Sequence, residues 1–152
     1  MISKAGWNHW LKEKTLESKI QNENRLFIKI SPKDLKEAVN QIVKDEEFTH
    51  IITITGIDIG KDVEVIYHLS LGRSILSLRT MVPKDNPTLS SIIDILPGAS
   101  IYEKEVHDLL GVSFEGNPDL TPLLLPDKWP RDVYPLRRDW PSDRLKRRLE
   151  NL

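Results

Sequence analysis

The feature that most limits how this chain can fold is a proline-rich stretch from Gly111 to Pro141. These 31 residues hold six of the ten prolines in the chain, and proline is excluded from helix interiors and central strands because it lacks a backbone N–H. Disordered linkers are poor in large apolar residues, whereas this stretch is rich in them. They are Val112, Phe114, Leu120, Leu123, Leu124, Leu125, Trp129, Val133, Tyr134, Leu136 and Trp140.

The stretch therefore predicts an irregular, extended arm whose apolar side chains need a surface to pack against. Fully extended, it would reach about 100 Å, and a structureless segment this long is unusual inside a compact domain. We predict that the arm docks on another protein. The chain then divides into an α+β domain over residues 1–110 and an extended docking arm with a basic tail over residues 111–152.

Composition limits what the domain can be. The chain has 152 residues, of which 39% are hydrophobic and 30% charged, and its net charge of −1 gives no overall indication of nucleic-acid binding. It has no cysteine, which excludes disulfides and thiolate ligation of zinc or an iron–sulfur cluster. We find no apolar run long enough to span a bilayer and no signal-peptide core at the N-terminus. We expect a protein on the cytoplasmic side, soluble or bound peripherally through partners.

The hydrophobic pattern predicts a small two-layer α+β domain. It indicates a mostly antiparallel four-stranded sheet packed by helices on one face, followed by the long, extended, Pro-rich C-terminal arm. Strands are predicted over residues 25–30, 49–58, 63–69 and 74–82. Helices are predicted over residues 4–20 with Trp7, Trp10 and Leu11 on one side, after Ser31 with an apolar face of Leu35, Ala38, Val39 and Ile42, over residues 88–96, and over residues 100–110 up to Gly111.

The candidates for catalysis are few. Glu103 and His107 stand four residues apart on one helical face, and with Asp108 they could form the acid–base site of a small stand-alone enzyme. Such a pair is more often a surface or interface pair. The histidines lack metal-site spacing, and the glycines form no phosphate loop. We assign no catalytic, cofactor-binding or metal-binding residue and expect no active site in this chain.

The C-terminal tail is basic. Between Arg131 and Arg148 there are seven basic and three acidic residues. A nucleic-acid-binding or lipid-binding tail is one interpretation, but Asp132, Asp139 and Asp143 would repel phosphate. Arginine forks suit carboxylates at a protein interface, which is the interpretation we favour.

The residues from Glu103 onward resemble the C-terminal signature of the complex I thirty-kilodalton subunit family, which includes the counterpart subunits of energy-converting, membrane-bound NiFe hydrogenases. The matching residues are Glu103-Lys104-Glu105, Asp108-Leu109-Leu110-Gly111, Gly116-Asn117-Pro118-Asp119-Leu120, Leu124-Leu125-Pro126, Trp129 and Pro135-Leu136-Arg137-Arg138-Asp139. The chain departs from the family pattern at Lys104, His107, Asn117 and Thr121-Pro122. The sequence Trp129-Pro130-Arg131-Asp132-Val133-Tyr134-Pro135 resembles the hydrogenase-type members.

The resemblance implies a non-catalytic peripheral-arm subunit of a membrane-associated redox complex, either an energy-converting hydrogenase or a complex I-like NADH dehydrogenase. Such a subunit wraps and positions the large catalytic subunit for electron transfer, beside a small Fe–S subunit. The resemblance implies no cofactor in this chain, because the Fe–S clusters, and in the hydrogenase branch a NiFe centre, belong to partner subunits. It implies no nucleic-acid partner, and contact with the membrane only through the complex.

The same resemblance, with the apolar arm, gives the residues expected to bind the partner. Glu103 and Glu105 are expected to pair with basic groups of the partner and to set the direction in which the arm leaves the helix. The full set is Glu103, Glu105, Phe114, Pro118, Asp119, Leu120, Leu124, Leu125, Pro126, Trp129, Tyr134, Pro135, Leu136, Arg137, Arg138, Asp139 and Trp140.

Overall fold

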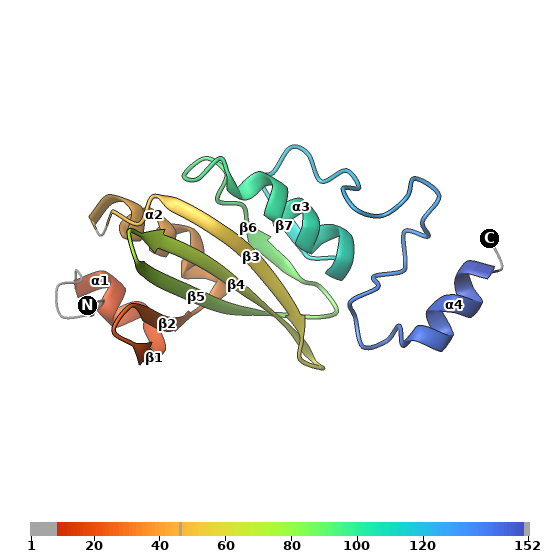
Figure 1. Ribbon diagram of the computed structural model, residues 1–152, viewed down its shortest axis with the longest axis horizontal. Helices are drawn as coiled ribbons and strands as arrows, with labels where there is room; N and C mark the ends of the chain where they lie inside the picture. Colours follow the sequence, from red (N-terminus) through yellow and green to blue (C-terminus); the bar gives the residue numbers. More distant parts are fainter. Residues whose placement is uncertain (1–8, 46, 151–152) are drawn as a thin grey trace.

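The computed structural model describes residues 9–45 and 47–150 (Figure 1). Trp7 and the start of the helix expected over residues 4–20 lie outside these ranges. The elements in chain order are α1 (His9–Lys14), β1 (Thr15–Asn22), β2 (Arg25–Ile30), the 3-10 turn η2 (Pro32–Asp34), α2 (Leu35–Asp45), β3 (His50–Asp58), β4 (Asp62–Leu71), β5 (Ser74–Pro83), β6 (Thr88–Ser90), α3 (Ala99–Leu110), β7 (Ser113–Glu115) and α4 (Ser142–Glu150).

The main sheet has five strands in the order β1-β2-β5-β4-β3. Every neighbouring pair is antiparallel except β2 and β5, which run parallel. The α+β class is therefore confirmed, and the predicted four-stranded sheet is corrected to a five-stranded mixed one. The four predicted strands are present as β2, β3, β4 and β5, and β1 is the additional edge strand.

β1 occupies residues that the sequence predicted to be helical. The helical spacing of Trp10 and Leu11 holds only as far as Lys14. Thr15 then opens the strand, and its Oγ1 donates a hydrogen bond of 2.7 Å to the Leu11 carbonyl at the end of α1. Pairing with β2 gives the backbone of β1 its hydrogen bonds. This outweighs the local helical preference, because the residues of β1 after Thr15 are exposed and would bury no apolar face as a helix.

The core lies between the sheet and helices α2 and α3. The predicted apolar face of α2, formed by Leu35, Ala38, Val39 and Ile42, is fully buried. Alternate residues of β4, such as Val65 and Tyr67, are buried in the same cluster. α3 packs against β3, where Gly56 lets the side chains of Val106 and Leu110 approach the strand. This contact sets α3 along the edge of the sheet (Figure 1).

The helix predicted over residues 88–96 is wrong. Residues 88–90 form β6, which pairs in parallel with β7 as a small second sheet, and the chain then turns as far as α3. Leu89 and Ile92 are buried. Pro87 and Pro97 leave little length for a helix between them, and the pairing with β7 could not be seen locally because its partner strand lies far along the chain.

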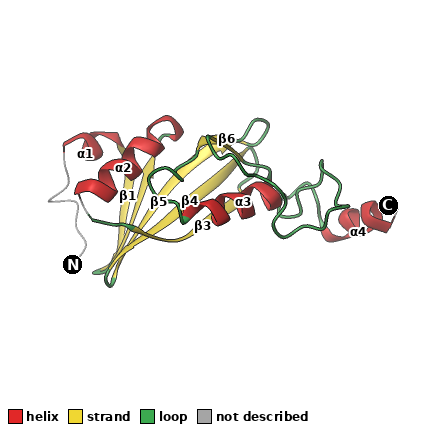
Figure 2. Cartoon of the chain, turned by 90° about the horizontal axis from the view of Figure 1, so that it is seen from above, coloured by secondary structure: helices red, strands yellow, loops and turns green. Residues whose placement is uncertain are grey.

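The long extended arm expected after Gly111 is not evident. Val112 and Phe114 are buried in the core, and β7 ties this part of the chain to β6. From residue 116 to residue 141 the chain is irregular and turns back past the end of α3 before α4 begins (Figure 2). No helix in the described part of the chain is both long and apolar enough to cross a bilayer.

A side chain at Gly56 is predicted to separate α3 from the sheet. A Cβ there would overlap the Leu110 side chain and lie 3.2 Å from Val106 Cγ1. We expect Gly56→Val to lower the free energy of unfolding by about 1–3 kcal/mol, as overpacking does, measured by urea denaturation. Thr55→Val, at the exposed neighbour on the same strand, is the control. Equal stability of the two variants would contradict this packing.

Candidate docking surface

Residues 116–141, here named the docking segment, contain no helix or strand yet follow a defined path. Prolines remove backbone donors from the segment, and its remaining donors need acceptors outside regular structure. Turns within the segment satisfy some of them, and three sets of contacts with the domain supply acceptors for others. The three sets lie at Asp108 on α3, at the C-terminal end of α3, and at Asp58 at the end of β3.

Asp108 holds the first part of the docking segment. One carboxylate oxygen, Oδ2, accepts hydrogen bonds from the backbone N–H groups of Leu123 at 3.2 Å, Leu124 at 2.8 Å and Leu125 at 2.9 Å. Lys104, one turn earlier on α3, pairs with Asp119 at 2.9 Å, and this contact, with Thr121, lowers the pKa of Asp119 to about 2. The segment is therefore fixed along the side of α3.

The C-terminal end of α3 holds the second part. Gly111 ends the helix with a left-handed φ of 73°, as the sequence predicted. The exposed carbonyls of the last turn then accept hydrogen bonds from Leu136 N, at 3.1 Å to Leu109, and from Arg137 Nε, at 2.7 Å to Leu110. A Cβ at Gly111 would lie 2.6 Å from the Tyr134 ring, so only glycine allows the segment to pass this close.

Asp58 holds the third part. Its Oδ2 accepts a hydrogen bond from the backbone N–H of Arg138 at 2.9 Å and from Lys84 Nζ at 3.3 Å. Lys84 also pairs with Asp139 at 3.1 Å. Burial would raise the pKa of Asp58, but the hydrogen bonds from Gly60, Arg138 and Lys84 together lower it. Sequence reasoning missed both Asp58 and Lys84. The one local signal is an acid at a strand end, two residues before a glycine.

Glu103 does not face outward as expected. It is fully buried, and its carboxylate accepts hydrogen bonds from Ser91 Oγ at 2.8 Å, Ile92 N at 2.9 Å and Asn117 Nδ2 at 2.9 Å. Burial raises the pKa of Glu103 despite these bonds. The expected ion pair with a partner is therefore corrected to an internal contact that joins α3, the turn after β6 and the start of the docking segment.

The other expected partner-binding residues differ in exposure. Phe114 is buried in the core, so it cannot contact a partner. The exposed members are Pro118, Asp119, Leu124, Pro126, Leu136, Arg138 and Asp139, and the half-buried members are Glu105, Leu120, Leu125, Trp129, Tyr134, Pro135, Arg137 and Trp140.

The exposed part of the docking segment is notably apolar. Leu124 is 58% exposed and Leu136 is 56% exposed, and Leu123 is 38% exposed. Ile101, on α3 two turns before Asp108, is 54% exposed. These side chains stand outward from a backbone that the domain fixes, so their exposure is a property of the folded chain.

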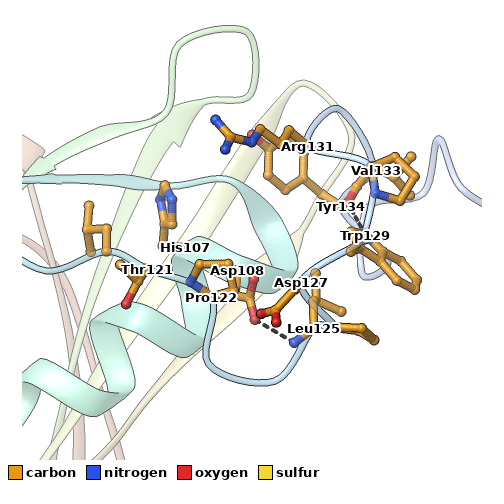
Figure 3. A pocket seen from close by; sticks show the side chains of 13 residues that line it. His107, Asp108, Thr121, Pro122, Leu125, Asp127, Trp129, Arg131, Val133 and Tyr134 are labelled. Atoms are coloured by element: carbon orange, nitrogen blue, oxygen red, sulfur yellow. Dashed lines mark hydrogen bonds between the residues drawn. The ribbon is translucent and has the colours of Figure 1, made fainter.

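A pocket of about 680 Å³ opens between α3 and the docking segment (Figure 3). Its wall includes His107 and Asp108 from α3 and Leu125, Trp129 and Tyr134 from the segment. The His107 ring bonds the Val112 carbonyl through Nδ1 at 2.8 Å, and Trp129 Nε1 donates to the Val133 carbonyl at 2.8 Å. The aromatic rim is thus held in place from within the chain.

The geometry does not assemble the acid–base site considered from the sequence. His107 and Asp108 line the pocket, but Glu103 does not, and the polar contacts of all three lead to other groups. Within residues 9–45 and 47–150, no three His, Asp or Glu side chains gather in a way that could hold a metal ion.

Residues 28–146 match the family model described as respiratory-chain NADH dehydrogenase, 30 kDa subunit. The chain is 28% identical over 128 residues to a subunit of the F420H2 dehydrogenase of Methanosarcina mazei, covering 82% of this chain and 80% of that protein. It is 34% identical over 121 residues to the beta subunit of the membrane-bound hydrogenase of Pyrococcus furiosus, covering 76% and 69%.

The fold is shared with a solved structure of the membrane-bound sulfane sulfur reductase, an archaeal respiratory membrane complex. The two chains superpose with a TM-score of 0.81 at 26% identity, over 94% of this chain and 88% of the other. Other curated relatives, which are subunits of NADH-quinone oxidoreductases, are longer. This chain spans about half the length of several of them, for example 56% for the relative from Acidothermus cellulolyticus and 54% for that from Salinispora tropica.

The buried carboxylate of Glu103 predicts a specific pH dependence. Because burial raises its pKa in the folded chain above the usual value of 4.5, its contribution to stability is complete below pH 4.5 and is lost as pH rises through the folded-state pKa. Glu103→Gln cannot titrate. The stability of the unaltered chain relative to this variant should therefore fall as pH rises above 4.5, measured by urea denaturation at successive pH values. A constant difference between the two would contradict the shift.

Proposed function

This chain belongs to the 30 kDa subunit family of the respiratory-chain NADH dehydrogenase, and we propose that it is a non-catalytic peripheral subunit of a membrane-bound redox complex. In this proposal the docking segment binds the large catalytic subunit and positions it for electron transfer. The observation that carries the proposal is that Leu123, Leu124 and Leu136 are exposed on a backbone that the domain fixes. The named relatives are themselves subunits of a dehydrogenase and a membrane-bound hydrogenase.

We propose the division into a domain over residues 1–110 and a docking part over residues 111–152. Val112 and Phe114 would then root the docking part in the core of the domain. The proposed contact residues are the exposed and half-buried members of the expected set, without Glu103 and Phe114. Of these, Leu124 and Leu136 offer the largest apolar gain on binding, since both are more than half exposed.

The partner subunits would supply the redox chemistry. The proposal places Fe–S clusters, and in a hydrogenase-type complex a NiFe centre, in the large subunit and in the small Fe–S subunit beside it. This chain would lie on the cytoplasmic side and reach the membrane only through the complex. The resemblance of the Trp129–Pro135 stretch to hydrogenase-type members favours that branch. In the structure Trp129 closes the stretch as a loop through its bond to the Val133 carbonyl.

Two other functions make different predictions. A stand-alone enzyme at the pocket would lose turnover with His107→Gln, whereas subunit docking would continue. A nucleic-acid module led by α4 would bind with a steep dependence on salt, whereas an apolar interface should persist at higher salt. The polar contacts of Glu103, His107 and Asp108 lead to other groups and not to one another, which weighs against the stand-alone enzyme.

Removing one exposed leucine from the docking segment should weaken binding without weakening the fold. We expect Leu124→Ser to raise the Kd for the large subunit of the same complex about tenfold or more, because a buried leucine side chain contributes about 1.5–3 kcal/mol. The free energy of unfolding of the isolated chain should change by less than about 0.5 kcal/mol. Calorimetric titration and urea denaturation measure the two quantities.

Leu16→Ser is the matched control. Leu16 is 66% exposed on β1, the edge strand at the opposite side of the sheet from β3 and α3. If both variants bound the large subunit as tightly as the unaltered chain, the docking segment would not be the interface.

Protease sensitivity offers an independent test. Residues 116–141 should be cleaved in the isolated chain more readily than the sheet, because they contain no helix or strand, and should become resistant when the large subunit is bound. Limited proteolysis followed by mass spectrometry locates the cuts. Equal resistance with and without the large subunit would count against docking by this segment.

A further inference from the structure

We propose that Asp108 is the positioning residue of the docking surface. Through one oxygen it holds the turn Leu123–Leu125 in the shape that presents Leu124 to the partner. This inference rests on the docking function proposed above. In this inference one buried carboxylate holds the docking surface in its binding conformation before the partner binds.

The turn lies between two prolines, Pro122 and Pro126. Neither proline has a backbone N–H, so this five-residue stretch has three backbone donors, one from each leucine. All three are directed at Asp108 Oδ2, at 3.2, 2.8 and 2.9 Å. Successive N–H groups that converge in this way form an anion-binding concavity. Here the anion is a side chain of the same chain.

Asp108 is well suited to fix this turn. It is only 8% exposed and stands near the end of α3, a helix packed on β3 through Val106 and Leu110. Hydrogen bonds to a carboxylate are stronger than those between neutral groups. Pro126 also disfavours helical backbone at Leu125. The turn is thereby limited at its C-terminal end by proline and at its centre by the helix.

The turn contributes little to the core that it is attached to. Leu123 and Leu124 are 38% and 58% exposed, so the three hydrogen bonds hold apolar side chains out in water. An arrangement that keeps apolar groups exposed gains nothing for the isolated fold, but it lowers the ordering cost when a partner covers them. A further exposed apolar side chain stands on α3, where Ile101 lies two turns before Asp108 and is 54% exposed.

The first test uses the full chain alone. Hydrogen exchange, resolved by NMR, should show the amides of residues 123–125 protected in the unaltered chain. Asp108→Ala should increase their exchange about tenfold or more, while the amides of β4 and β5 keep their rates. Asp108→Asn retains one acceptor oxygen and should give intermediate protection. Fast exchange of these three amides in the unaltered chain would overturn the proposal.

The second test measures binding to the large subunit of the same complex by surface plasmon resonance. Asp108→Ala should lower the association rate constant about fivefold or more, because only the fraction of chains with the turn formed can bind. Asp108→Asn should recover part of the rate. Asp127→Ala is the matched control, since Asp127 lines the same pocket, while the three N–H groups of the turn are directed at Asp108.

The outcomes separate the two proposals. If the unaltered chain binds and Asp108→Ala binds equally fast after losing protection at residues 123–125, the positioning role is refuted and docking stands. If the unaltered chain does not bind, the docking function fails and the positioning role fails with it. If Asp108→Ala also loses protection in β4 and β5, its fold is damaged, and the test then uses Asp108→Asn. If Asp108→Asn has the same exchange rates at residues 123–125 and the same association rate as the unaltered chain, the positioning role is refuted.

Discussion

Hydrogen bonds from backbone N–H groups to buried carboxylates are the interaction on which this structure depends. Prolines remove the possibility of a helix or a central strand from the docking segment, so its path cannot be set by a ladder of backbone bonds. Asp58 and Asp108 replace that ladder. Each lies on a regular element of the domain, is less than one tenth exposed, and accepts backbone N–H groups from residues 15 to 80 positions away.

Glu103 extends the same arrangement to the other side of α3. Its carboxylate joins the turn after β6 to Asn117 at the start of the docking segment. Burying a carboxylate is costly, and its raised pKa reflects that cost. The cost is offset when each oxygen accepts hydrogen bonds that would otherwise be missing. In this chain the acids thus determine where the irregular part of the chain lies, while the apolar core determines the sheet and helices.

This division explains what could be predicted from the sequence. The strands β2, β3, β4 and β5 and the buried face of α2 follow from local periodicity, and the structure has them close to where the pattern placed them. The helix expected over residues 88–96 failed because β6 is stabilised by β7, a partner more than twenty residues away. The helix expected up to residue 20 failed because the edge of β2 offered β1 a backbone partner. The pairing of β6 with β7 is long-range, whereas β1 and β2 form a hairpin in which Asn22 pairs with Arg25, and in both cases strand pairing overrode local helical preference.

The candidate site also contains residues whose contacts could not be predicted from the local sequence. Glu103 and Glu105 were both expected to face a partner, but residues two apart on a helix point in different directions, and α3 turns Glu103 inward. The spacing of Glu103 from Ala99, Val106 and Leu110 places it on the buried face of the helix, and this was the local signal that it faces inward. Its hydrogen-bond donors, more than ten residues away, become visible only when the chain is folded. The apolar content of the docking segment was visible, and so was its shortage of donors.

The apolar content of the docking segment and its shortage of backbone donors together constrain function more than either does alone. An irregular segment could hide its leucines against its own domain if its backbone were free to turn. Here the donors of residues 123–125 face inward to Asp108, so the side chains of Leu123 and Leu124 are left facing outward. The segment cannot turn these leucines inward while these hydrogen bonds persist. By directing Asp108 inward and Leu123 and Leu124 outward, the chain keeps an apolar surface that a second protein can cover.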